Sequence, residues 1–311
     1  MLFEQVLVHL HALTLFCFSF ILRFITSSNS SPFMRTQHAS FPRFSRMASM
    51  LAHWFRRTPR PIPAALWQRT LGEFTFLAML QRADRMQLHR LASRFLAQKQ
   101  FSGAHGLVVT DAMAVAIAAQ ACLPLLHLGG SEASALKLYD DFTGIVLHPG
   151  AMLARRERRD AAGVVHTYRE ALVGEAMAGG PVTLSWQDVQ SAGALAQRGH
   201  NVVIHEFIHK IDMKTGQPNG CPPLPSRVAK AQWQHVMQTN FDSFCQQVTM
   251  AERFGADAPW LDAYGATHPA EFFAVAAEAY FVNRARFCQD FAALTALFDA
   301  FFRPTDVPTP V

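Results

Sequence analysis

The 311-residue chain lacks paired cysteines, a strong charge of either sign and any apolar run long enough to span a membrane. Its five cysteines are widely spaced and form no CxxC pair, a pattern typical of a reduced, cytoplasmic protein and not of a disulfide framework. The 28 Lys and Arg residues against 23 Asp and Glu residues leave a formal net charge of only +5. Half of the residues are hydrophobic, so the chain can bury a substantial core.

The densest charge lies at residues 155–160, RRERRD, where four arginines are interleaved with two acidic residues. Mixed signs at this spacing are typical of a solvated surface. We therefore expect no direct binding of nucleic acid.

The first fifty residues differ in composition from the rest. The apolar stretch at residues 12–22 is shorter than the about 20 residues that a spanning helix needs. No Lys or Arg precedes it and no small-x-small cleavage site follows, so a signal peptide has little support. We expect residues 1–49 to be a disordered or non-native extension, with a targeting peptide or membrane anchor as the alternatives, and no stable membrane association.

Helical periodicity dominates the next part of the chain. Apolar residues at helical spacing over 64–98 predict two helices. Residues 112–126 are Ala-rich and nearly uncharged, which predicts a buried helix capped near Thr110 and interrupted near Pro124.

Three short runs with the composition of strands then follow, at residues 144–148, 163–166 and 182–186. They predict a small sheet. A capping-box pattern at the end of the third run predicts a helix over 186–196. No internal repeat accompanies them.

His205, Glu206 and His209 form an HExxH pattern on a predicted helix that begins near Asn201 and closes near Gly216. Residues four apart lie one turn apart on the same helix face, so both imidazoles can bind one ion. Glu206 is rotated by about 100° from His205 and can act as general base without binding the metal. The pattern predicts a zinc hydrolase, and the alternative is a pair of histidines that face solvent.

A catalytic zinc takes three protein ligands, so a third must be found. Asp212 shares the face of His205 but lies about 10 Å further along the helix axis, so we expect it to support the site or the helix end. Glu271 and Glu278 share one face of an apolar helix predicted to start near Pro269, where two buried acids need a partner. We predict Glu271 as the third ligand and Glu278 as the carboxylate that orients a histidine; the alternative is that both face solvent.

These residues resemble the Mlc titration factor A family of zinc peptidases, whose metal site is similar to that of anthrax lethal factor. The departures are Ile208 inside the HExxH, Gly265 after Tyr264, and a longer segment at 129–138. The resemblance covers roughly residues 50–303. Its matching segments are residues 61–67, 101–103, 117–127, 180–186, 201–212 and 264–275.

With this resemblance, the expected fold is α+β: a mainly helical, zincin-like metallopeptidase domain over 50–303, with a small β-sheet beside the HExxH helix. We expect a helical N-terminal part at 64–127 and a catalytic part at 140–303, followed by a C-terminal tail at 304–311. The strand at 182–186 is expected to be the edge along which an extended peptide lies.

The resemblance also implies the site. His205, His209 and Glu271 would bind Zn²⁺, and Glu206 would be the general base. Tyr264 lies seven residues before Glu271, the spacing that the family's motif requires, and its phenol would stabilise an oxyanion.

The function implied is that of a zinc-dependent, aminopeptidase-like enzyme of the cytoplasm. It would hydrolyse peptide substrates and also bind the sugar-uptake repressor Mlc. The first alternative is a regulatory repressor-binding protein with weak or latent peptidase activity. The second is a zinc hydrolase that acts on a small ester or amide.

Overall fold

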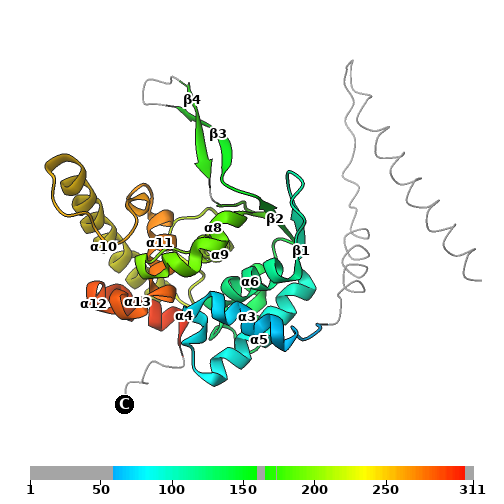
Figure 1. Cartoon of the computed structure of the whole chain (residues 1–311). Helices are drawn as coiled ribbons and strands as arrows, with labels where there is room; N and C mark the ends of the chain where they lie inside the picture. The colour runs from blue at the N-terminus through cyan, green and yellow to red at the C-terminus, as the bar shows by residue number, and fades with distance from the viewer. Residues whose placement is uncertain (1–58, 160–164, 173, 305–311) are drawn as a thin grey trace, which may run out of the picture. The chain divides into compact units, whose positions relative to one another are not determined.

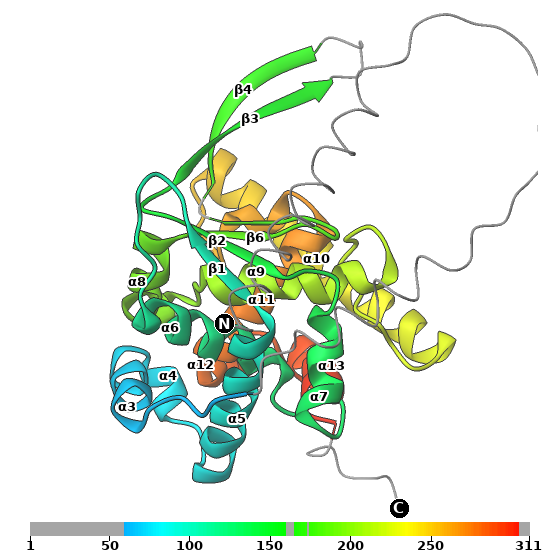
Figure 2. The ribbon, with the colours of Figure 1, turned by 90° about the vertical axis from the view of Figure 1, so that its right-hand side faces the viewer.

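The computed structural model describes residues 59–159, 165–172 and 174–304, with side chains for 59–151 and 174–304 (Figures 1 and 2). The extension predicted over 1–49, most of the tail and the first part of the 163–166 run lie outside these ranges. Within them, no helix combines the length and the apolar character that crossing a membrane requires.

The described chain is α+β: mainly helical, with one four-stranded sheet and one two-stranded ribbon. Two helices were expected over 64–98, but the backbone leaves the helical region at Phe74 (φ −119°, ψ 85°) and a one-turn helix intervenes. The helices of this first part are α3 (Ala64–Glu73), α4 (Thr75–Ala78), α5 (Arg82–Gln98) and α6 (Asp111–Cys122).

The Ala-rich helix predicted at 112–126 is α6, and it is buried. Its start is fixed by Thr110, whose Oγ1 accepts a hydrogen bond from the Met113 amide at 3.3 Å. The predicted interruption near Pro124 is confirmed, because α6 gives way to the 3₁₀ turn Leu123–Leu125.

The four-stranded sheet has the order β1-β2-β6-β5. Strands β1, β2 and β6 run parallel, and β5 pairs antiparallel with β6. The strand predicted at 182–186 is therefore not an edge: β6 pairs with β2 on one side and β5 on the other, so its backbone is occupied. The strands are β1 (Gln100–Gly103), β2 (Gly144–His148), β5 (Gly174–Ala176) and β6 (Val182–Ser185).

A separate ribbon joins β3 (Met152–Arg159) to β4 (Val165–Leu172). The pairing is antiparallel and runs from Met152 opposite Leu172 to Arg159 opposite Val165. The run at 155–160 falls mostly in β3, where side chains are not described, so its solvated face stays a prediction.

The remaining helices build the second half of the described chain. The helix predicted over 186–196 is α8, and Ser185 caps it by accepting a hydrogen bond from the Asp188 amide at 3.4 Å. The segment 129–138 contains the short helix α7 (Glu132–Ala135). The others are α8 (Trp186–Leu195), α9 (Val202–Asp212), α10 (Arg227–Phe254), α11 (Pro269–Val282), α12 (Arg284–Asp290) and α13 (Ala292–Phe302).

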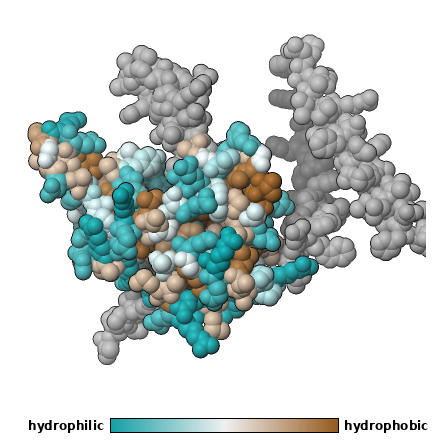
Figure 3. Space-filling view, in the orientation of Figure 1, coloured by the Kyte–Doolittle hydropathy of each residue, from teal (hydrophilic) through white to brown (hydrophobic). Residues whose placement is uncertain are grey.

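Helix α9 lies in the middle of the core and packs against β5, β6, α6 and α11. Apart from Val202, its apolar residues are fully buried, whereas the face of the molecule in Figure 3 is mostly hydrophilic with small apolar groups. A helix buried by this many elements has little freedom to move, which makes it a rigid support for a site. These buried residues are Val203, Ile204, Phe207, Ile208 and Ile211.

Candidate metal centre

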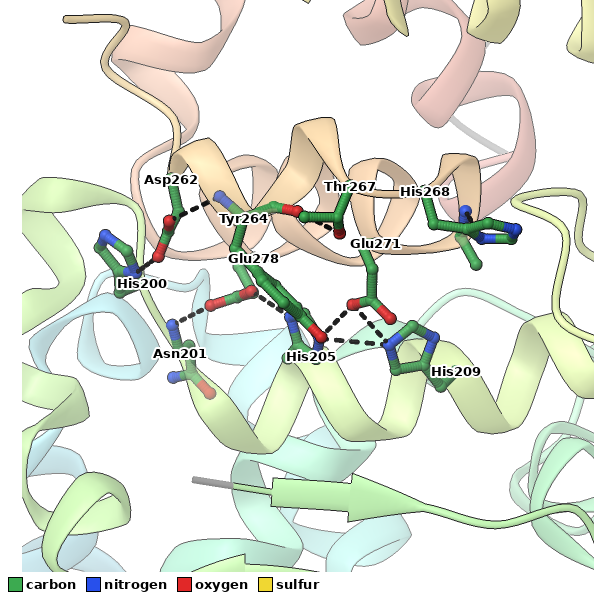
Figure 4. Close-up of polar contacts among 11 residues, drawn as sticks. His200, Asn201, His205, His209, Asp262, Tyr264, Thr267, His268, Glu271 and Glu278 are labelled. Carbon is green, nitrogen blue, oxygen red and sulfur yellow. Dashed lines mark hydrogen bonds and ion pairs between the residues drawn. The ribbon is translucent and has the colours of Figure 1, made fainter. Parts of the chain in front are cut away.

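The HExxH residues lie on α9, whose first turn is capped by Asn201. The Asn201 Oδ1 accepts a hydrogen bond from the Ile204 amide at 2.9 Å. Because they are four residues apart, His205 and His209 present their imidazoles on the same side of the helix, with ring centroids 4.8 Å apart (Figure 4).

Glu271 reaches the same point from α11. The helix begins at Pro269, and the His268 Nδ1 accepts a hydrogen bond from the Ala270 amide at 3.2 Å, so Glu271 falls in the first turn. The Glu271 Oε2 lies 3.1 Å from His205 Nε2 and 3.2 Å from His209 Nε2, and the two nitrogens are 3.1 Å apart. Among the described residues, this is the one group of three side chains that could hold an ion.

The triangle of donor atoms fits a small divalent ion. Tetrahedral ligands at the about 2.0–2.1 Å typical of zinc are separated from one another by roughly 3.3–3.4 Å. The three observed distances lie close to that value. In the tautomers that bind a metal, all three atoms carry lone pairs and repel one another, and a cation between them removes this repulsion.

Glu278 lies two turns further along the same face of α11. Its Oε1 accepts a hydrogen bond from His205 Nδ1 at 2.6 Å, which leaves Nε2 of that ring to face Glu271 (Figure 4). Its Oε2 accepts the Asn201 backbone amide at 2.5 Å. Asn201 Nδ2 in turn donates to Gln120 Oε1 at 2.8 Å, and Gln120 Nε2 donates to the Ala116 carbonyl oxygen at 3.0 Å.

The electrostatics of the group favour a positive charge at its centre. Burial lowers the pKa of His205, but the charge of Glu278 and hydrogen bonds with both carboxylates outweigh it and raise the pKa well above its usual value. Burial raises the pKa of Glu271, and the hydrogen bonds with His205 and His209 reverse this and hold the pKa below its usual value. Two imidazoles among three buried or half-buried carboxylates could therefore hold a cation.

Glu206 lies against the edge strand of the sheet and is not one of the three donor residues. Burial raises the pKa of its carboxyl group. Among the described residues, its Oε2 is buried without a hydrogen-bond partner. Its Oε1 lies against Gly174 of β5 so closely that a Cβ built on that glycine would be 2.4 Å away. The edge strand therefore covers the Glu206 carboxylate directly, and only a glycine fits there.

Tyr264 lies in the 3₁₀ turn Ala263–Ala266, ahead of α11. Its side chain is 43% exposed, and its ring centroid lies 6.2 Å from that of His205 (Figure 4). Asp262 caps the turn, since its Oδ1 accepts the Tyr264 amide at 2.9 Å, while its Oδ2 lies 3.4 Å from His200 Nδ1. This contact ties the tyrosine's turn to the residue just before the α9 cap.

Asp212 is not part of the donor triangle. Its carboxylate accepts the backbone amides of Gly220 and Cys221 at 2.8 and 3.0 Å. The expectation of a helix-end carboxylate agrees with these contacts. Gly220 has a positive φ of 79°, and a Cβ there would lie 2.6 Å from the Pro269 carbonyl oxygen, so this loop braces α9 against the start of α11.

Comparison with known proteins gives the family. Residues 51–303 match the model of a family described as glucose-regulated metallo-peptidase M90. The chain belongs to this family. It is 33% identical over 251 residues to the Mlc titration factor A of Serratia proteamaculans (strain 568), covering 80% of this chain and 91% of that protein. The protein of the same name from Yersinia pestis (strain Pestoides F) is 33% identical over 229 residues, 73% of this chain and 80% of that protein.

Membership of the M90 metallopeptidase family implies a metal ion, and the donor triangle offers a site for one. Sequence reasoning missed two supporting residues. Gln120 sits in an Ala-rich helix with no sign of a polar role, and its place beside Asn201 depends on packing between α6 and α9. Gly174 lies in a three-residue strand, and a single glycine after an apolar run was the only signal.

Proposed function

We propose that this member of the M90 family is a zinc-dependent, aminopeptidase-like peptidase with a zincin-like catalytic domain. In this proposal His205, His209 and Glu271 bind zinc, Glu206 is the general base and Tyr264 stabilises the oxyanion. The observation that carries it is the convergence of two imidazole nitrogens and a carboxylate oxygen within 3.2 Å of one another.

Zinc is favoured over harder ions by the donor set. Two neutral imidazoles and one carboxylate suit zinc, whereas magnesium and calcium prefer oxygen ligands throughout. Bound there, zinc would supply Lewis-acid polarisation of the scissile carbonyl and of the attacking water. Glu278, with its 2.6 Å hydrogen bond to His205 Nδ1, would fix the tautomer in which Nε2 is free to bind.

Side chains of the protein would transfer the proton from the attacking water to the leaving amine. Glu206 has a carboxylate oxygen without a hydrogen-bond partner, and its raised pKa suits a group that takes a proton from water and returns it to the leaving amine. Tyr264, near His205, would donate its phenolic hydrogen to the oxygen on which charge develops.

An extended peptide would bind along β5. Among the described residues β5 pairs with β6 alone, so its outer edge can accept another strand. This edge passes directly over Glu206 at Gly174, which would bring a bound backbone to the general base.

The deciding experiment is Glu206→Gln. The amide keeps the volume of the side chain but cannot accept the proton, so turnover of aminoacyl and peptidyl anilides should fall by about 10²–10⁴-fold. Zinc content should stay near one per chain. Glu73→Gln, on the exposed end of α3, is the control and should leave both unchanged. Full turnover by the zinc-loaded Glu206→Gln protein would exclude the proposed base.

A second candidate function is repressor binding, because the relatives carry the name Mlc titration factor A. In that case the chain would act mainly by binding an Mlc-like repressor, with weak or latent peptidase activity. Pull-down of the repressor by the Glu206→Gln protein would support binding that is independent of catalysis, and failure of wild-type protein to retain it would count against this role.

We also propose domain boundaries and a cellular compartment for this protein. We propose one peptidase domain over 50–303 with a helical part at 64–127 and a catalytic part at 140–303. A cytoplasmic location is supported by the four cysteines of the described residues, all of which are free thiols.

A further inference from the structure

Lys210 follows the second histidine of the HExxH and is fully buried, with 0% of its surface exposed. Its ammonium donates hydrogen bonds to the Met177 and Gly180 carbonyl oxygens at 2.5 and 2.9 Å and to Asp141 Oδ2 at 3.2 Å. It also lies 4.5 Å from the centre of the Phe142 ring. A buried cation is costly unless fully partnered, and here three acceptors take its three protons.

Two of those acceptors belong to the turn that joins β5 to β6. The turn is tight: the Gly180 amide donates to the Met177 carbonyl oxygen at 3.0 Å, and Gly179 has a positive φ of 65°. Lys210 therefore binds both ends of this turn to α9.

The strand that the turn carries has few contacts of its own. β5 spans only three residues and, within the described ranges, pairs with a single neighbour at three positions. A strand this short depends on its flanks for its position.

The spacing of residues on α9 explains how one helix can carry the proposed metal ligands and also hold β5 in place. His205 and His209 are one turn apart and face Glu271, whereas Glu206 and Lys210 form a second pair, one residue on. Glu206 contacts the start of β5 at Gly174, and Lys210 binds the turn beyond its end. The helix that carries the metal ligands thus holds the edge strand at two points.

We propose that Lys210 is a positioning residue that holds the edge strand β5 at a fixed place over Glu206 and thereby governs the binding of extended peptides. The substrate half of this statement rests on the proposed function. The structural half, in which Lys210 holds β5 in place, is called the clamp below, and it does not depend on any catalytic activity.

Amide hydrogen exchange tests the clamp in the full chain. In Lys210→Met, exchange over residues 174–180 should accelerate by about tenfold or more, because hydrogen bonds to a charged donor are lost. Exchange in α9 and α11 should change by less than about twofold. The matched control is Lys214→Met, one turn on, whose ammonium forms ion pairs with Asp140 and Asp141 and, within the described residues, no ion pair or side-chain hydrogen bond with residues 177–180.

Steady-state kinetics test the substrate half. KM for an extended peptide of six residues should rise by about tenfold in Lys210→Met, with a smaller change in kcat, because the strand that the peptide joins is displaced. KM for a single-residue anilide should change much less.

Each outcome tests either the clamp or its effect on the binding of extended peptides, which is the substrate half of the proposal. Unchanged exchange over 174–180, or an equal rise throughout the chain, would overturn the clamp. An equal rise in both KM values would overturn the substrate half. A wild-type protein that cleaves neither substrate would defeat the proposed function while exchange still decides the clamp. If circular dichroism finds Lys210→Met unfolded, Lys210→Gln, which keeps a donor for one carbonyl, is judged by the same criteria.

Discussion

Replacing Gly174 by alanine would place a methyl carbon inside the space that the Glu206 side chain occupies. The new Cβ would lie 2.4 Å from Oε1, 2.6 Å from Cγ and 2.7 Å from Cδ, whereas an ordinary contact begins near 3.4 Å. Either the carboxylate or the strand must therefore move by roughly 1 Å. Glu206 is 4% exposed on a helix packed from several directions, so neither movement is free.

A displacement of this size has a calculable effect on turnover. A misplacement of about 1 Å in a catalytic group can cost about 100-fold in rate, which is about 2.7 kcal/mol of transition-state stabilisation. We expect kcat/KM of Gly174→Ala to fall by about that factor while metal content is unchanged, since Gly174 lies against Glu206, which is not one of the three proposed metal ligands. Stability should fall by about 1–3 kcal/mol from overpacking.

The assay compares kcat/KM, metal content and urea unfolding for Gly174→Ala with Gly72→Ala. A Cβ at Gly72, inside α3, would meet nothing within 4 Å, so this control should keep full activity and gain about 0.5–1 kcal/mol in stability. Combined with the shorter Glu206→Asp, Gly174→Ala should cost less than it does alone. Wild-type kcat/KM in metal-loaded Gly174→Ala would refute the placement of β5 over Glu206, the proposed general base.

Two further predictions concern the support of the site and the core beneath it. Glu278→Gln should weaken metal binding by about 10–100-fold, because the amide no longer fixes the His205 ring as the carboxylate does; competition with a chelator measures this, and an unchanged affinity would count against it. Burial lowers the pKa of Lys99 to about 8 from an ordinary 10.5, although the charge of Asp141 acts in the opposite direction. The folded pKa is the lower one, so the unfolded state binds more protons between about pH 8 and 10.5, and stability from this group rises with pH across that window. Relative to Lys99→Met, the unfolding free energy in urea should rise there by up to about 3 kcal/mol, and a flat difference would contradict the assignment.

Local sequence signals were sufficient to predict the helices that carry the donor residues. Asn201 is a good N-cap, and the apolar spacing after it predicts a helix that closes near Gly216; in the structure α9 ends at Asp212 and a 3₁₀ turn, Met213–Thr215, leads to Gly216. The strand at 144–148 is found with the predicted bounds, because its apolar residues are framed by glycine and proline. The start of α11 near Pro269 follows from the preference of proline for the first turn.

Local signals of this kind could not predict which distant segments pair in the sheet. The sequence Gly174-Glu-Ala has no β-branched or aromatic residue, so nothing marks it as a strand, and without it β6 was wrongly expected at the edge. Likewise Gln100–Gly103 becomes a strand only because β2 lies beside it. Which neighbour a strand acquires is decided by tertiary packing.

The hydrogen bonds that run from Gln120 through Asn201 and Glu278 to His205 join three helices from both halves of the chain. A fragment starting at residue 140 would lose Gln120 together with β1. The Asn201 side-chain amide would then lack its acceptor, and β2 would lack its neighbour in the sheet. The residues expected to form a helical part and a catalytic part therefore share one hydrogen-bond network. Protein engineers who wish to shorten this chain should leave α6 in place.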